Sequence, residues 1–126
     1  MNNEQQIQSV IQTYFECMYE SSAQKAHDAF HPNAMITGYI GGGLQESTVG
    51  QFAELVASHQ PSPKEKGEAA ILDVLSIEVA GDTAVARVRD AYLGLMFLDT
   101  LSLIKVDGQW QIYNKLFHVE GELKAQ

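Results

Sequence analysis

The sequence predicts one α+β domain, residues 1–126, in which helices pack on one face of a curved antiparallel sheet. Two observations favour this fold. Up to about residue 60, apolar side chains recur with the period of a helix, whereas from Ala69 onward they alternate with the period of a strand. Short turns that contain glycine then divide the second part into hairpins, so the helices precede an antiparallel meander.

The N-terminal part predicts three helices, over residues 3–20, 23–30 and 48–59. The apolar side of the first helix is formed by Ile7, Val10, Ile11, Tyr14, Phe15 and Met18. Asn3 can cap this helix, and Gln6 completes a capping box. The second helix ends at His31-Pro32, because a residue before proline avoids the helical conformation. Ser47 or Thr48 caps the third helix.

A short strand is predicted over residues 34–40, between the second and third helices. Gly41-Gly42-Gly43 follows it and predicts a turn. The triple glycine lacks the Lys-Ser/Thr pair of one nucleotide-binding loop and the glycine spacing of the other, which argues against a phosphate site.

Four further strands are predicted over residues 69–80, 83–92, 95–106 and 109–119. Their turns are Gly81-Asp82, Leu93-Gly94 and Asp107-Gly108. A two-residue turn sets the register of a hairpin, so the facing residues can be derived. On the inner face this register pairs Asp73 with Asp90, Asp90 with Phe97, Val88 with Asp99, Asp99 with Leu116, Phe97 with His118 and Leu101 with Asn114.

The polar residues of this largely apolar inner face gather at one end. Asp73, Asp90 and His118 share a row, and Asp99 lies in the next one. Because a buried charge costs several kcal/mol unless it is paired or hydrated, this end predicts the mouth of a pocket. We expect that pocket to hold about 300 Å³ or more. Asp99 and His118 are diagonal neighbours, about 5–8 Å apart at Cβ, within reach of a carboxylate–imidazole contact.

Three residues are candidates for catalysis: His118 as general acid/base, Asp99 as the group that orients it, and Tyr14 as a hydrogen-bond donor. A structural Asp–His pair is the alternative. Asp73 and Asp90 could share one proton, unless a bulge separates them or Lys64 or Lys66 approaches. The candidate ligand-binding residues are Met18, Phe52, Asp73, Asp90, Tyr92, Phe97, Trp110 and Asn114. Core packing is the alternative role for the apolar members of this set.

The outer face of the sheet also carries large side chains, namely Met96, Leu98, Tyr113 and Phe117. A monomer seldom leaves so much aromatic and aliphatic surface in water, so we expect a homodimer through this face.

Charge and composition argue against several classes of binding partner. The net charge is −8 and neither half of the chain has a basic stripe, which argues against nucleic acid and anionic membranes. No apolar run approaches the roughly 20 residues that a bilayer requires. The polar N-terminus and the single Cys17 favour a cytoplasmic protein in which that thiol packs as a small apolar group. His27 and His31 have the spacing of a helical metal pair, but Pro32 spoils that geometry, so we expect no metal and no cofactor.

Four segments together resemble the nuclear transport factor 2-like superfamily, and within it the putative lumazine-binding group. They are Phe30-His31-Pro32-Asn33-Ala34, Gly81 to Ala86, Phe97 to Leu103, and Asp107 to Ile112. The resemblance implies a cone-shaped, cystatin-like α+β fold with a pocket between helices and sheet, usually in a dimer. Ketosteroid isomerase-like relatives place a carboxylate base on the first strand, which residues 34–40 lack, although Tyr14 matches their helical tyrosine. Polyketide cyclase-like and scytalone dehydratase-like relatives use His and Asp in the pocket, parts that Asp99 and His118 could take.

These observations lead to two hypotheses of function. The first is a small-molecule-binding domain, with the option of cofactor-free isomerase, dehydratase or cyclase chemistry on a small hydrophobic or aromatic substrate. The second is a non-enzymatic, dimeric interaction or accessory module.

Overall fold

The computed structural model describes residues 1–123. Its helices are α1 (Asn3–Tyr19), α2 (Ala23–Ala29) and α3 (Val49–Ser58). Its strands are β1 (Phe30–Ile40), β2 (Gly43–Thr48), β3 (Leu72–Ala80), β4 (Thr83–Tyr92), β5 (Leu95–Val106) and β6 (Gln109–Glu122). The three predicted helices and the four strands of the predicted meander are all present, with ends that shift by up to three residues.

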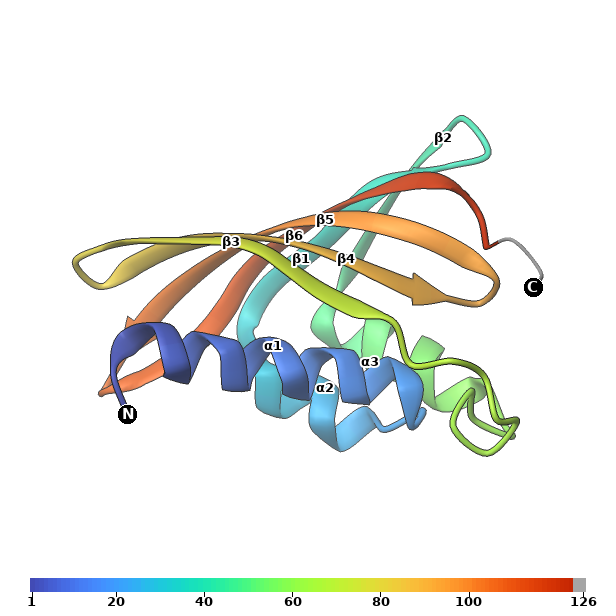
Figure 1. Ribbon diagram of the computed structural model, residues 1–126, viewed down its shortest axis with the longest axis horizontal. Coiled ribbons are helices and arrows are strands. Elements are labelled where there is room, and N and C mark those ends of the chain that lie inside the picture. The colour runs from blue at the N-terminus through green and yellow to red at the C-terminus, as the bar shows by residue number, and fades with distance from the viewer. Residues whose placement is uncertain (124–126) are drawn as a thin grey trace.

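The six strands form one curved, open sheet in the order β2-β1-β6-β5-β4-β3. All neighbours are antiparallel except β1 and β6, which run parallel. Figure 1 shows the helices on one side of this sheet, with α1 lying along it and the β1–β2 hairpin projecting at one edge. The molecule therefore has the α+β architecture that the sequence predicts.

The apolar side of α1 faces the sheet, as its spacing predicts, and Ile7, Ile11 and Tyr14 are fully buried there. The predicted cap of this helix is displaced by one residue. Asn2 caps it and Gln5 closes the capping box, in place of Asn3 and Gln6. This shift leaves the buried face of the helix unchanged.

Strand β2 is absent from the sequence prediction, and β1 begins four residues earlier than predicted. Gly41 and Gly42 form the expected turn with positive φ, but the chain then returns along β1 as β2. All six residues of β2 are wholly or partly exposed. An edge strand that buries neither face has no apolar alternation, which explains why the pattern did not reveal it.

The β4–β5 hairpin has the predicted register throughout. Asp90 faces Phe97, Val88 faces Asp99, and Ala86 faces Leu101. Leu93 and Gly94 in its turn both have positive φ, as a primed two-residue turn requires.

The other two hairpins start in the predicted register and then shift, once between β3 and β4 and twice between β5 and β6. In β6, Ile112 faces Leu103, but Asn114 faces Ser102, so Tyr113 is an extra residue. In β3, an extra residue at Leu75 separates the pair Ser76–Arg87 from the pair Val74–Val88. Because side chains alternate between faces, one extra residue exchanges the faces for the rest of the strand.

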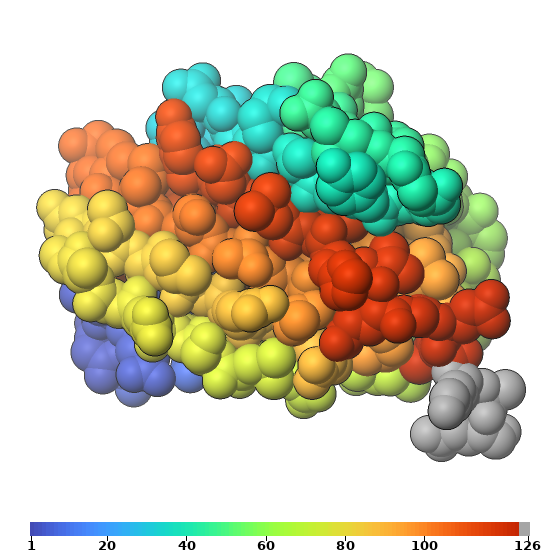
Figure 2. Space-filling view, turned by 90° about the horizontal axis from the view of Figure 1, so that it is seen from above, coloured from blue at the N-terminus to red at the C-terminus, as the bar shows by residue number. Residues whose placement is uncertain are grey.

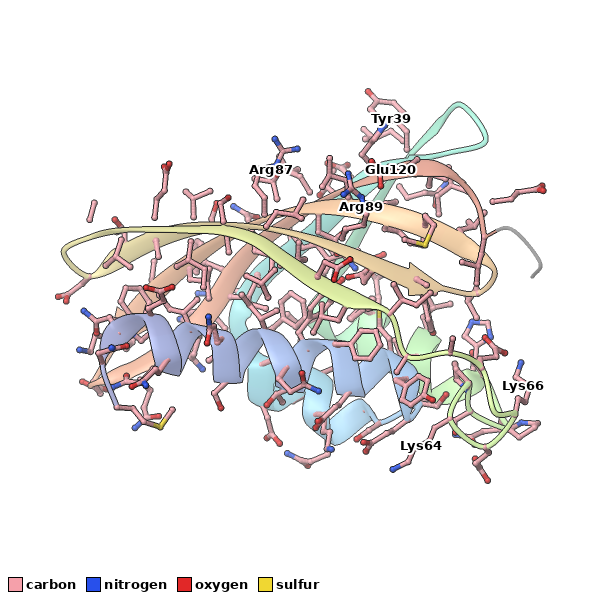
Figure 3. The ribbon with its side chains drawn as sticks, viewed as in Figure 1. Tyr39, Lys64, Lys66, Arg87, Arg89 and Glu120 are labelled. Carbon is pink, nitrogen blue, oxygen red and sulfur yellow. The ribbon has the colours of Figure 1, made fainter. Side chains whose placement is uncertain are left out.

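The outer face of the sheet, opposite the helices, carries both charge and apolar groups. Figure 2 views this face, with β2 at one side and β3 at the other. Figure 3 shows Tyr39, Arg87 and Arg89 projecting from it, and Arg89 forms an ion pair with Glu120 at 2.7 Å. Phe117 does not lie here as predicted, since the β6 bulge turns it toward the helices. Within residues 1–123, no helix is long and apolar enough to cross a membrane.

Candidate functional site

A cavity of about 180 Å³ lies between α3 and the concave face of the sheet. Its walls are mainly aliphatic and aromatic: Ile36, Ile40, Phe52, Leu55, Tyr92, Leu93, Leu95, Phe97 and Phe117. Gln45, Ser47 and Lys115 are its polar members. The predicted ligand-binding residues Phe52, Tyr92 and Phe97 therefore meet in one cavity, which is smaller than the predicted 300 Å³.

Lys115 is the charged side chain of this lining, and only 5% of the residue is exposed. Its Nζ lies 4.7 Å from the ring centroid of Tyr14, 4.9 Å from that of Phe52 and 5.7 Å from that of Phe117. Within the described part of the chain, this ammonium has no hydrogen-bond acceptor and no ion-pair partner. The faces of three aromatic rings are therefore its closest favourable contacts.

Tyr14, Asp99 and Asp90 form a buried hydrogen-bonded group beside Lys115. The Tyr14 hydroxyl lies 2.7 Å from Oδ2 of Asp99 and 3.3 Å from Oδ2 of Asp90. Both carboxyl groups are at most 1% exposed. Oδ1 of Asp99 has no hydrogen-bond partner among residues 1–123. Strand pairing places this group next to the cavity, because Phe97 faces Asp90 and Phe117 faces Asp99.

Burial sets the protonation of this group. The pKa of Asp90 is raised from 3.8 to about 9, first by burial and then by the negative charge of Asp99 and a hydrogen bond with that side chain. Burial and the two carboxyl groups also hold the pKa of Tyr14 well above its usual value. At neutral pH, Asp90 is therefore protonated and Tyr14 is neutral.

Three predicted site residues lie elsewhere. His118 and Asn114 are exposed on the outer face, because the bulge at Tyr113 exchanges the faces of β6. Asp73 is exposed and faces Arg89, because the bulge in β3 has the same effect. The expected contacts of Asp99 with His118 and of Asp73 with Asp90 are wrong for this reason. The contact of Tyr14 with Asp99 is present, and its catalytic role stays a prediction.

Met18 and Trp110 are buried core residues that do not line the cavity. Trp110 lies near the β5–β6 turn, and its Nε1 donates to Oδ1 of Asn3 at 3.2 Å. Both positions were predicted from apolar spacing alone, which does not separate core from cavity wall.

The sequence prediction missed Lys115. With a regular register this lysine faces Thr100 on the outer face, where a lysine needs no explanation. The one available signal is the run Ile112-Tyr113, in which two large residues in succession interrupt the alternation of β6. Such an interruption is typical of a bulge, and it would have turned Lys115 inward.

Cys17 is fully buried, and burial raises its pKa to about 12, consistent with the predicted packing role. Among residues 1–123, no three His, Cys, Asp or Glu side chains gather as a metal site would require.

The chain is similar in structure to several proteins of the nuclear transport factor 2-like fold. A protein of unknown function from Silicibacter pomeroyi superposes with a TM-score of 0.84 at 20% identity, covering 95% of this chain and all of the other. One from Shewanella baltica gives 0.81 at 23% identity, over 97% and 99% of the two chains. One from Methylobacillus flagellatus gives 0.82 at 26% identity, over 96% of each.

In sequence, the chain is 29% identical over 105 residues to a Cladobotryum protein named "Aldolase FrzH", which covers 83% of this chain and 82% of that protein. The model of the family described as "Putative lumazine-binding" matches residues 2–118. Because that match spans nearly the whole sequence, the chain belongs to this family, as the resemblance of its motifs indicates.

Proposed function

We propose that this protein binds a small, largely apolar carbonyl compound in the cavity beside Lys115 and acts on it as a cofactor-free acid/base enzyme. The observation that carries the proposal is the Lys115 ammonium, which lies in an otherwise uncharged lining and has no acceptor of its own. A fixed positive charge in a water-poor cavity stabilises negative charge that develops on a bound molecule.

The reaction class follows from what such a charge stabilises. Transfer of a proton from the carbon next to a carbonyl group to a solvent water leaves an enolate, whose oxygen would accept a hydrogen bond from Lys115. Water is the proton acceptor here because the lining formed by residues 1–123 contains no carboxylate and no imidazole. Isomerisation, dehydration, cyclisation and aldol addition all use this intermediate. The relative that is named an aldolase supports the same chemistry.

The Tyr14–Asp99–Asp90 group has a supporting role in this proposal. It lies beside Lys115, whose Nζ is 4.7 Å from the ring centroid of Tyr14. Asp90 also holds a proton at neutral pH, because its pKa is raised to about 9. The lining of the cavity does not include these three residues, so they act through Lys115 and we describe them as positioning residues.

The test uses the one step that all these reactions share. Monocyclic ketones and aldehydes are incubated with the protein in D₂O, and deuterium incorporation at the carbon next to the carbonyl is followed by NMR. Exchange should exceed the background with at least one compound, and Lys115→Met should lower it about 100-fold, the size expected for loss of one oxyanion donor. Lys66→Met, on the exposed loop after α3 (Figure 3), is the matched control and should exchange like the wild type.

Two results would contradict the enzymatic proposal. One is exchange that Lys115→Met leaves unchanged. The other is binding of these compounds without exchange, which would favour a non-enzymatic binding module.

We also propose that two copies associate through the outer face of the sheet. Exposed apolar side chains there include Val85, Tyr113 and Leu116, which are 36–56% exposed. Met96 and Leu98 lie on the same face and are partly buried, whereas Phe117 is no longer a candidate. Light scattering should show a dimer that Tyr113→Asp converts to a monomer, and a wild-type monomer at high concentration would contradict this.

A further inference from the structure

Two buried polar side chains of the cavity lining have no hydrogen-bond partner among residues 1–123: the ammonium of Lys115, which is the charged one, and the hydroxyl of Tyr92. Buried polar groups are almost always hydrogen-bonded, and a buried ammonium has a large need for acceptors. Only 5% of Lys115 is exposed. Aromatic rings surround its Nζ, and residues 1–123 supply no hydrogen-bond acceptor for it.

The charges around the cavity indicate which acceptor fits. The chain carries 16 Asp and Glu residues, yet none of them belongs to the cavity lining. Asp99 and Asp90 lie outside the lining, and each has Oδ2 within 3.3 Å of the Tyr14 hydroxyl. An anion in the cavity would therefore meet one positive charge and no acidic side chain in the walls.

The walls of the cavity limit the size and the polarity of the rest of the bound molecule. Phe52, Phe97 and Phe117 present aromatic surface, and the volume of about 180 Å³ lies below the range of pockets for drug-sized ligands. A single ring or a short branched chain with one charged end matches this combination. We infer that the bound molecule is a small monocyclic or branched organic carboxylate, whose carboxylate group accepts hydrogen bonds from Lys115.

This inference rests on the proposed function, because it names the class of molecule that the same cavity takes. A carboxylate one or two bonds from a carbonyl group, as in a 2-oxo or 3-oxo acid, would place both oxygens within reach of one ammonium. The charged group would then hold the molecule while the carbonyl oxygen becomes the enolate oxygen.

Calorimetric titration with matched probes tests the inference on the wild-type protein, without any variant. Benzoate, phenylacetate, cyclohexanecarboxylate and 3-methylbutanoate are each compared with their own primary amide, which has the same shape and no charge. At least one acid should bind about 10-fold to 100-fold more tightly than its amide, which corresponds to one charge-assisted hydrogen bond in a buried site. If no acid binds more tightly than its amide, the inference is wrong.

Lys115→Met then assigns the preference to this residue. The variant keeps an unbranched apolar side chain as far as Cε and removes the ammonium, so it should bind the amides as the wild type does and lose the preference for acids. The exposed Lys66→Met should retain that preference. A preference for acids that persists in Lys115→Met would overturn the inference, because the anion would then bind elsewhere.

These results separate the inference from the proposed function. Acid binding through Lys115 without deuterium exchange would leave the inference intact and contradict the enzyme. Exchange with neutral ketones that requires Lys115, without any preference for acids, would support the enzyme and overturn the inference.

Discussion

Strands β4 and β6 each place an ionisable side chain on the inner face of the sheet, Asp90 and Lys115, yet they do so in different ways. In β4 the register against β5 is unbroken, and Asp90 lies where simple alternation places it. In β6 one extra residue, Tyr113, exchanges the faces, so that Lys115 and Phe117 turn inward and His118 turns outward. The comparison teaches that a single bulge determines whether the cavity contains a histidine or a lysine.

The largest expected loss of stability comes from a substitution in β5, whose register against β4 is regular. Asp99→Leu removes the acceptor of the Tyr14 hydroxyl from the buried group that also contains Asp90. Breaking a buried polar network by removing one member costs about 3–5 kcal/mol of unfolding free energy, measurable by urea denaturation. His118→Ala, at the exposed end of β6, should change stability by less than about 0.5 kcal/mol. Equal effects of the two substitutions would contradict the described faces of the sheet.

The pH dependence of the free energy of unfolding tests the β4 side of this comparison, because it reports the protonation of Asp90. Its pKa is raised from 3.8 to about 9 in the folded chain, so the folded state holds a proton that the unfolded state releases. The stabilisation from this proton is complete below about pH 4 and is lost progressively as the pH rises toward 9, with a slope of at most about 1.4 kcal/mol per pH unit.

Asp90→Asn carries an amide in place of the protonated acid and is the control for this measurement. The free energy of unfolding of the wild type minus that of the variant should fall between pH 4 and pH 9. A difference that stays constant or rises with pH would show that Asp90 ionises normally.

A smaller effect is expected where β1 meets β6. Gly38 lies against Phe117, and an added Cβ would come within 2.4 Å of its carbonyl oxygen. Gly38→Ala should therefore shift the inward-facing part of β6 and cost about 1–3 kcal/mol. In Gly43→Ala, by contrast, the nearest atom lies 3.7 Å from the new Cβ, so thermal denaturation should show little change. Comparable losses in both variants would contradict the close approach of β1 and β6.

Much of the fold could be predicted from the sequence, because helical spacing and turn chemistry act locally. The hydrogen bond of Tyr14 with Asp99 was not predicted, and the catalytic roles of both residues stay predictions. The position of Lys115 could not be predicted from alternation, because a bulge depends on how β6 fits against β1 and β5. The edge strand β2 was missed since it buries no apolar face.

The position of Lys115 is the central claim, and NMR tests it most directly. Three aromatic rings within 6 Å of Nζ should move the side-chain proton resonances of Lys115 upfield of an exposed lysine. We predict nuclear Overhauser contacts from these protons to the rings of Tyr14 and Phe52, and none from the His118 ring. Contacts between His118 and Tyr14, together with Lys115 resonances at their values in solvent, would contradict the account.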